Sequence, residues 1–284
     1  MNSTFPLRRA LRGPVKYVQA VLRWKRLAFN EAPPVFGNSK PKSGSHLLVQ
    51  ILAGFCRIMP YIYVDSEPVR TINKEGGRRE AERILADLQS IPRGVIGWGY
   101  VDATPENVAF LTQPGRVNYF VYRDPRDLLV SHVFFATEMH EGHGMHAFYQ
   151  TLPDFNERLK IAITGIDRDG LYMVNVKQRY EGVFRWLATP GVLCLRFEDL
   201  INQREAALNA MLDEVEKTGY QIPTPREQAL AALMEAIRPH KSRTFRSGKT
   251  GGWKQYFTEE HKKLFKEVAG DLLVQLGYEQ NNDW

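Results

Sequence analysis

The sequence has few cysteines and no long apolar run. Cys56 and Cys194 are its only cysteines, and both lie in apolar stretches. Buried thiols of an intracellular protein are therefore expected, rather than a framework of disulfides. No stretch of about 18 consecutive apolar residues occurs, which argues against a transmembrane helix. No internal repeat is visible, which disfavours a solenoid.

Acidic side chains are absent from the first 30 residues, which carry seven Lys and Arg. This segment also lacks the apolar centre of a secretory signal. We expect a basic arm or helix over residues 1–32, followed by a single domain over residues 33–284. Two interpretations of the arm stay open: a basic helix that lies on an anionic membrane, or a solvated helix that packs on the body through Val18, Leu22 and Phe29. The protein is accordingly expected to be cytoplasmic, with membrane association as the alternative.

The bulk composition is that of a globular protein. The chain has 284 residues, of which 43% are hydrophobic and 25% charged, and its formal net charge is +6. This excess of positive charge favours anionic partners such as a nucleotide. Binding of nucleic acid would rest on charge alone, because no basic face with interleaved aromatic residues is visible after residue 30.

Strand patterns alternate with helix patterns along the chain. Strands are expected at residues 35–39, 94–100, 117–122 and 191–197. Helices are expected at residues 45–56, in the stretch before residue 90, from residue 125 onward in segments up to residue 187, and at residues 198–218. This alternation predicts an α/β fold with a parallel sheet covered by helices on both faces. Ligands of such sheets bind at the carboxyl ends of the strands.

The segment "PKSGS" follows the first expected strand and precedes a helix. Free N–H groups and the positive end of the dipole at a helix start attract an anion. Gly44 lets the backbone approach that anion closely, Ser43 and Ser45 add hydroxyl groups, and Lys42 adds a charge. The pattern GxxxxGK[ST] is absent, so this is not a Walker A loop. An ordinary turn is the alternative interpretation.

Two more charged segments have the features of anion sites. In "YRDPRDLLVSH", Arg123 ends a strand and Ser131 follows eight residues later, which suits a phosphate clamp, although a network of Arg and Asp ion pairs is the alternative. In "FRSGKTGGWKQYF", basic residues alternate with glycines, as in a flap that closes over a nucleotide. A plain loop between helices is the alternative there.

These three segments together resemble sulfotransferases that use 3′-phosphoadenosine 5′-phosphosulfate (PAPS). "PKSGSHLL" is similar to the 5′-phosphosulfate loop PKSGT of that family, "YRDPRDLLVSH" to its 3′-phosphate motif, and "RSGKTGGWKQYFT" to its C-terminal RKGxxGDWK signature. Their order and spacing match over about residues 34–278. The resemblance implies a P-loop-like parallel sheet sandwiched by helices, and transfer of a sulfuryl group from PAPS to a hydroxyl or amine, with 3′,5′-adenosine bisphosphate (PAP) as the product.

The resemblance also implies roles for individual residues. Lys42 would stabilise the departing phosphate, while the 5′-phosphate would be held by Ser43, Gly44, Ser45 and His46. The 3′-phosphate would be held by Arg123, Ser131, Arg246, Ser247 and Gly248. Phe197 stands in the nucleotide site where the family often has Tyr, and Ser247 stands where it has Lys. Lysines and arginines supply the countercharge, so no metal is expected.

The general base of many cytosolic members is missing. Those enzymes carry a His about 22 residues before the Arg of the 3′-phosphate motif, whereas "VIGWGYVDATPEN" here contains none. Tyr100, Asp102 and Glu67 are the candidates, and each has a structural alternative as a core, turn or surface residue. A base must reach the acceptor's proton and have a suitable pKa.

The histidines have other interpretations. His132 follows Ser131 and could face the cleft, but packing within a helix is favoured. His140, His143 and His146 with Glu141 have spacings compatible with a metal, yet two glycines disfavour a regular helix there. A mobile lid over the acceptor explains residues 140–146 better.

The acceptor cannot be read from the sequence beyond a small molecule. Aromatic residues, namely Trp98, Tyr100, Phe134, Phe135 and Phe148, suggest an apolar or aromatic one. Two rival functions stay open. A small-molecule kinase would need a Lys after the glycine of the loop and ligands for Mg²⁺, and a non-catalytic PAP- or PAPS-binding protein would fit the missing His but not the intact Lys42.

Overall fold

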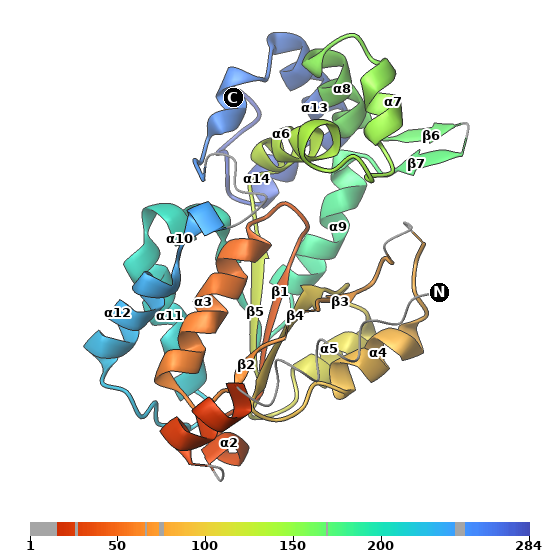
Figure 1. Ribbon diagram of the computed structural model, residues 1–284. Helices are drawn as coiled ribbons and strands as arrows, with labels where there is room; N and C mark the ends of the chain where they lie inside the picture. The colour runs from red at the N-terminus through yellow and green to blue at the C-terminus, as the bar shows by residue number, and fades with distance from the viewer. Residues whose placement is uncertain (1–15, 26–27, 66, 74–76, 169, 242–247) are drawn as a thin grey trace.

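A parallel sheet forms the centre of the protein. The computed structural model describes residues 16–25, 28–65, 67–73, 77–168, 170–241 and 248–284. Within these ranges the sheet has six strands in the order β2-β4-β1-β5-β8, with β3 also paired to β4 (Figure 1). The strands are β1 (Val35–Ser39), β2 (Tyr63–Val64), β3 (Val69–Arg70), β4 (Val95–Tyr100), β5 (Val117–Tyr122) and β8 (Leu193–Arg196), and all their pairings are parallel. The expected α/β fold is confirmed.

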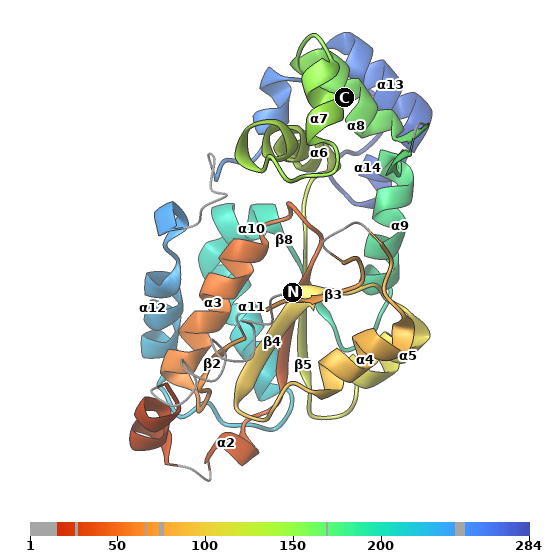
Figure 2. The same ribbon diagram turned by 45° about the vertical axis from the view of Figure 1, so that its right-hand side comes forward.

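Helices cover both faces of this sheet. One face is covered by α3 (Ser45–Ile58), α11 (Arg204–Glu216) and α12 (Arg226–Ala236), with α10 (Phe197–Asn202) at their upper end. The other face is covered by α4 (Ala81–Gln89), α5 (Pro105–Leu111) and α9 (Val176–Leu187) (Figure 2). The short α2 (Ala28–Glu31) precedes β1.

Alternation along β5 explains why the sheet has two cores. Tyr119 and Val121 belong to the hydrophobic core with α3 and α11, whereas Phe120 and Tyr122 belong to the core with α5 and α9. Successive side chains of a strand point to opposite faces, so a strand buried on both faces is almost entirely apolar. Every residue of β5 is buried.

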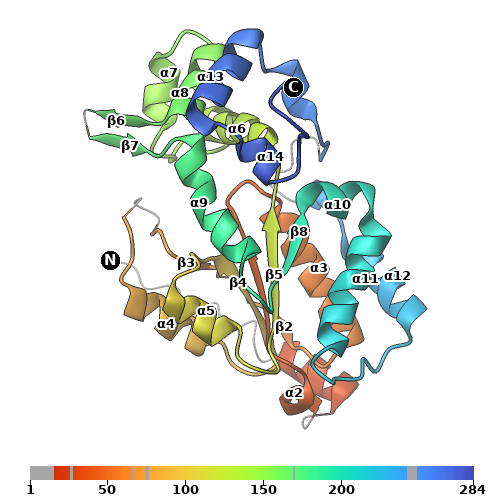
Figure 3. The ribbon, with the colours of Figure 1, turned by 180° about the vertical axis from the view of Figure 1, so that it is seen from behind.

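A second group of helices lies beyond the carboxyl ends of the strands (Figure 3). It comprises α6 (Pro125–Phe134), the π-helical turn η1 (Phe135–Met139), α7 (His146–Thr151), α8 (Phe155–Thr164), α13 (Glu259–Ala269) and α14 (Leu272–Gln275), with the antiparallel pair β6 (Ile166–Arg168) and β7 (Leu171–Met173). The 3₁₀ turns η2 (Pro239–Lys241) and η3 (Gly252–Gln255) lie in the late segment. The loops that follow β1 and β5 therefore face this helical layer.

Local sequence signals account for several boundaries. Asp124 accepts a hydrogen bond from the backbone N–H of Arg126 and caps α6, with Pro125 at the first helical position, as predicted. The single helix expected over residues 198–218 is wrong, because the chain breaks at Gln203 into α10 and α11. The expectation of helical segments alone up to residue 187 is also wrong, because β6 and β7 form a hairpin there.

The N-terminal helix over residues 16–24 differs from one of the two interpretations of the arm. Val18 is 55% exposed and Leu22 is 80% exposed, so packing of the arm through these two side chains is wrong, whereas Phe29 in α2 is buried. None of the described helices has the length and hydropathy needed to cross a bilayer. Cys56 and Cys194 are free and half-buried, and burial raises the pKa of Cys56 to about 12 and that of Cys194 to about 11.

Candidate functional site

The loop between β1 and α3 is built for close approach of a ligand to the backbone. Ser43 N–H donates to the carbonyl of Lys40 at 3.0 Å, and Lys42 has a left-handed φ of 70°, which is rare for a residue with a side chain. Gly44 precedes α3 with a φ of 95°, and a Cβ at this position would lie 2.4 Å from Cδ2 of Phe197. Glycine is therefore required here twice, by conformation and by space.

Several serine hydroxyl groups of β1 and of the loop after it lie inside the protein. The Oγ atoms of Ser39 and Ser43 are buried and have no hydrogen-bond partner among the described residues. Ser45 Oγ lies 2.9 Å from the hydroxyl of Tyr100. His46 lies on the solvent side of the loop, and partial burial followed by the charge of Lys42 lowers its pKa. Unpaired buried hydroxyls beside a helix start suit an anionic ligand.

Arg123 connects the three charged segments. Its guanidinium, at the end of β5, donates to the carbonyl of Lys42 at 3.5 Å and to the carbonyl of Lys249 at 3.3 Å. It lies 4.5 Å from the ring centre of Phe197. The residue is only 9% exposed, and its Nε has no hydrogen-bond partner among the described residues. The structure thus brings together the loops after β1 and β5 and the late glycine-rich segment.

Asp127 anchors the late segment to α6. Its two carboxylate oxygens accept the backbone N–H groups of Gly251 and Trp253, both at 2.8 Å. One of these oxygens also lies 3.7 Å from the guanidinium of Arg123. Gly248 precedes this anchor with a φ of 60°. The other two residues expected in the flap, Arg246 and Ser247, lie outside the described residues.

The other charged residues of "RDPRD", Asp124 and Arg126, form ion pairs and hydrogen bonds within the fold. Arg126 pairs with Asp124 at 2.7 Å, is almost fully buried, and stacks on Trp253 at 3.9 Å. The backbone N–H of Asp124 donates to Glu198, whose carboxylate also accepts the hydroxyl of Tyr278. Burial raises the pKa of Glu198 and of Asp124. The ion-pair interpretation of this motif is therefore correct for both arginines, because Arg123 also pairs with Asp127 at 3.7 Å while its guanidinium contacts the loops.

The other expected nucleotide contacts flank these loops. Ser131 lies half-buried on α6, eight residues after Arg123. Phe197 begins α10, is buried, and separates Gly44 from Arg123. Both residues therefore belong to the elements that carry the convergent loops.

The three candidates for a general base have different surroundings. Tyr100 contacts Ser45 in the loop, and the guanidinium of Arg70 lies 5.2 Å from its ring centre. Asp102 pairs with Arg78 at 3.3 Å, whereas Glu67 is exposed. Only Tyr100 of the three has a direct contact with the Lys42 loop.

Two cationic residues near the site, Lys40 and Arg179, were not among the site residues predicted from the sequence. Lys40 begins the turn after β1, and its pKa is lowered by burial and by Arg179, an effect that Asp102 opposes. Arg179 lies in the first turn of α9, and its pKa is lowered by burial. Arg179 is half-buried because α9 packs near the loop after β1, which is far away along the chain. The spacing of charged residues within a helix does not indicate such a contact, so no sequence signal could have identified Arg179.

The histidine-rich segment gives no metal site among the described residues. His146 Nδ1 is 2.8 Å from the carbonyl of Ala136, and His143 Nδ1 accepts the backbone N–H of Met145 at 3.1 Å. His140 and His143 also contact the ring of Phe135, at 5.4 and 5.8 Å. These residues therefore pack on the π-helical turn.

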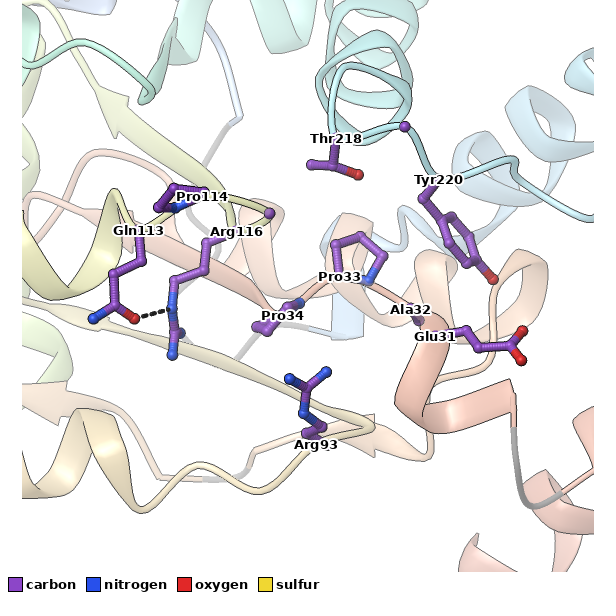
Figure 4. Close-up of a pocket in the computed structure, with 12 residues that line it drawn as sticks. Glu31, Ala32, Pro33, Pro34, Arg93, Gln113, Pro114, Arg116, Thr218 and Tyr220 are labelled. Atoms are coloured by element: carbon purple, nitrogen blue, oxygen red, sulfur yellow. Dashed lines mark hydrogen bonds between the residues drawn. The ribbon is translucent and has the colours of Figure 1, made fainter.

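A pocket at the opposite end of the sheet is separate from this site. It has a volume of about 460 Å³ and is lined by segments that precede the strands, among them Pro34 before β1, Arg93 before β4 and Arg116 before β5 (Figure 4). Lys42 and Arg123 follow β1 and β5, so they lie at the carboxyl ends. Ligands of parallel sheets bind at the carboxyl ends, which favours the Lys42 loop as the functional site.

Comparisons with known proteins agree with this geometry. The sulfotransferase domain family matches residues 119–277. No curated protein sequence matches the chain. Among solved structures, mouse sulfotransferase SULT7A1 complexed with PAP is similar with 16% identity, coverage of 87% of this chain and 86% of that one, and a TM-score of 0.56.

A retinol dehydratase is also similar in two complexes. The complex with androsterone and PAP has 15% identity, covers 90% of this chain and 85% of that one, and has a TM-score of 0.58. The complex with retinol and PAP has 17% identity, covers 92% and 86%, and has a TM-score of 0.56. At these identities the likeness shows a shared fold.

Replacing Asp127 with Asn tests how the late segment is held. Asn keeps the size but has one acceptor oxygen, so one of the two N–H groups, of Gly251 or Trp253, loses its partner. A lost hydrogen bond to a charged group costs roughly 1.5–3 kcal/mol, about ten- to a hundredfold in local opening. Hydrogen exchange measured by NMR should therefore be faster at one or both amides. Asp271→Asn, at an exposed site, serves as the control, and equal protection in Asp127→Asn would contradict this role.

Proposed function

The chain belongs to the sulfotransferase domain family, and on this premise we propose that it transfers the sulfuryl group of PAPS to a hydroxyl or amine of a small molecule. One observation carries the proposal: the guanidinium of Arg123 contacts the backbone of both Lys42 and Lys249. A single small nucleotide could therefore touch all three charged segments at once.

The donor atoms around Arg123 suit a doubly phosphorylated nucleotide. Ser43 Oγ and Arg123 Nε are buried without partners among the described residues, and both can donate to phosphate oxygens. We assign the 5′-phosphate to Ser43, Gly44, Ser45 and His46, and the 3′-phosphate to Arg123, Ser131 and Gly248, with Arg246 and Ser247 as further proposed contacts outside the described residues. Phe197 would support both ends, because it lies between Gly44 and Arg123.

Lys42 is the proposed catalytic cation. Its ammonium lies 3.8 Å from the ring centre of Phe135, on the side of the loop that faces the helical layer. PAPS supplies an activated sulfuryl group when bound. Lys42 would then neutralise the charge that develops on the departing phosphate, as fixed cations do in phosphoryl transfer. Because Lys and Arg provide this countercharge, the proposal includes no metal.

An apolar alcohol or phenol is the proposed acceptor. Of the five aromatic residues that suggested it, Phe135 and Tyr100 contact the Lys42 loop. Trp98 is buried and donates to the carbonyl of Asp65, and Phe134 packs on Phe155, so these two are core residues. The similar retinol dehydratase forms complexes with androsterone and PAP and with retinol and PAP, which supports an apolar acceptor here.

Replacing Arg123 with Ala tests the nucleotide site. Isothermal titration should show PAP binding to the wild-type protein, and the loss of charge-assisted hydrogen bonds at roughly 1.5–3 kcal/mol each should weaken it by about ten- to a hundredfold or more. Arg83→Ala, at an exposed position, is the matched control. Equal affinity for ATP and PAP would instead favour the kinase, and unchanged PAP binding by Arg123→Ala would remove this residue from the site.

Replacing Lys42 with Ala separates catalysis from binding. Turnover of ³⁵S-labelled PAPS with a panel of phenols, alcohols and amines should fall by about 10²–10³, the cost of losing one charge-stabilising group. PAP affinity should fall by less than tenfold, since the loop amides remain. Lys263→Ala, on an exposed face, is the control. PAP binding without transfer to any acceptor by the wild type would favour the non-catalytic alternative.

We also propose that the N-terminal arm contacts anionic membranes. The helix over residues 16–24 exposes Val18 and Leu22, four residues apart on one face, next to Lys16 and Arg23. Exposed apolar side chains beside basic ones are typical of a helix that lies in a membrane interface. In this proposal residues 1–32 act as the arm and residues 33–284 form the catalytic domain.

Vesicle cosedimentation tests the arm. The protein should bind vesicles of phosphatidylcholine mixed with phosphatidylserine more strongly than vesicles of phosphatidylcholine alone. Changing Val18 and Leu22 to Ser should weaken binding by about tenfold or more, because burial of each side chain contributes roughly 1.5–3 kcal/mol. Ile72→Ser, which removes another exposed apolar side chain, should have no effect. Equal binding by the double variant would contradict the proposal.

A further inference from the structure

His132 is a buried histidine beside the proposed site. It lies on α6 directly after Ser131 and is 7% exposed. Its Nε2 has no hydrogen-bond partner among the described residues. A buried polar atom left unpaired costs about 1–3 kcal/mol, so a ligand that pairs with this nitrogen offers an explanation for its persistence.

Ring contacts connect His132 to the catalytic cation. His132 and Phe135 are three residues apart in a helix, so they share a face. The ring of His143 lies 5.2 Å from that of His132 and 5.8 Å from that of Phe135. The ammonium of Lys42 in turn lies 3.8 Å from the ring centre of Phe135. His132 is therefore part of the same cluster as Lys42.

The helix is irregular at this point. After Phe134 the α-helical pattern gives way to the π-helical turn η1, which contains Phe135. π-Helical turns occur frequently at functional sites, because the extra residue changes the direction of side chains. The irregularity therefore lies at Phe135, the residue against which the ammonium of Lys42 packs.

The surroundings of His132 keep its imidazole neutral. Burial lowers its pKa well below the ordinary value of 6.5, and Arg179 of α9, His143 of the loop after η1 and Lys42 lower it further. Tyr149 of α7, whose own pKa is raised by burial, packs against the ring at 6.0 Å. Among the described residues, the charged and titratable groups that shift this pKa include no carboxylate. A neutral imidazole at pH 7 has a lone pair available to accept a proton.

The earlier base candidates are occupied or remote. Tyr100 pairs with Ser45, Asp102 pairs with Arg78, and Glu67 is exposed. The strand region where the family has a His contains none here. However, α6 places another histidine, His132, in the same cluster as Lys42.

We propose that His132 is the catalytic base of sulfuryl transfer, an inference that rests on the proposed function. The acceptor's O–H proton moves to Nε2 of His132 as the acceptor oxygen forms a bond to sulfur. The bond between sulfur and the 5′-phosphate oxygen breaks, and its electron pair stays on that oxygen beside Lys42. His132 then releases the proton to water after the products leave.

His132→Gln tests this role, with His140→Gln at an exposed position of the adjacent loop as the matched control. Transfer from labelled PAPS to 4-methylphenol should fall by about 10²–10⁴ in His132→Gln, the contribution typical of a general base. Transfer to p-nitrophenol, which is far more acidic and loses its proton near neutral pH without a base, should fall much less. The wild-type rate should decrease at acid pH as His132 becomes protonated, and this decrease should vanish in the variant.

Readouts independent of turnover keep the inference distinct from the proposed function. Histidine NMR of the protein without nucleotide should give His132 a pKa below 6.5, and titration should give PAP affinities within threefold for wild type and variant, because a base that contacts the acceptor adds little to nucleotide binding. An equal loss with both phenols, or a decrease at acid pH that persists in the variant, would overturn the role of base. Absence of PAP binding to the wild type would instead contradict the proposed function.

Discussion

The structure depends on a buried guanidinium at the end of the central strand. Arg123 donates to two carbonyls from loops that are about 80 and 126 residues away along the chain. Carbonyl contacts orient the cation without neutralising it, and a buried charge is costly unless it is paired. Asp127 forms an ion pair with it at 3.7 Å, and its two oxygens also accept backbone N–H groups. Nε of Arg123 has no hydrogen-bond partner among the described residues, and it is the donor that we propose for an anionic ligand.

The sheet and the helical layer beyond it place different residues around Arg123. The sheet presents the turn with Lys42 and Gly44, whose conformation is fixed by φ and by contact with Phe197. The helical layer presents α6 and the histidine cluster from the other side. Because the strand ends and the helices face each other, donors for a nucleotide and groups for an acceptor can meet without a deep cavity in the sheet.

Much of this arrangement could be predicted from the sequence, because the signals are local. Gly44 after a strand, Asp124 with Pro125 at a helix start, and the apolar run of β5 each specify their own neighbourhood. The family match begins at residue 119, so the Lys42 loop was assigned from its own motif and its place in the fold. The break at Gln203 and the β6–β7 hairpin have no comparable signal. The exposure of Leu22 and the positions of His132 and Arg179 depend on contacts between distant segments, which periodicity does not encode.

The roles of charged residues show the same limit. "RDPRD" contains two arginines with similar neighbours in the sequence, yet Arg126 pairs with Asp124 at 2.7 Å, whereas Arg123 pairs with Asp127 at 3.7 Å and also donates to the carbonyls of two loops. Tertiary packing decides which contacts each of them makes. The same reasoning applies to the histidines, since His146 lies beside a main-chain carbonyl, whereas Nε2 of His132 has no hydrogen-bond partner in the part of the chain that the structure describes.

A structure of the protein with PAP tests the central claim most directly. The account predicts that one nucleotide spans the site, with its 5′-phosphate at the amides of residues 43–46 and its 3′-phosphate at Arg123 and Ser131. PAP bound at the pocket near Arg93 and Arg116, or bound with its two phosphates on a single one of the three segments, would contradict it.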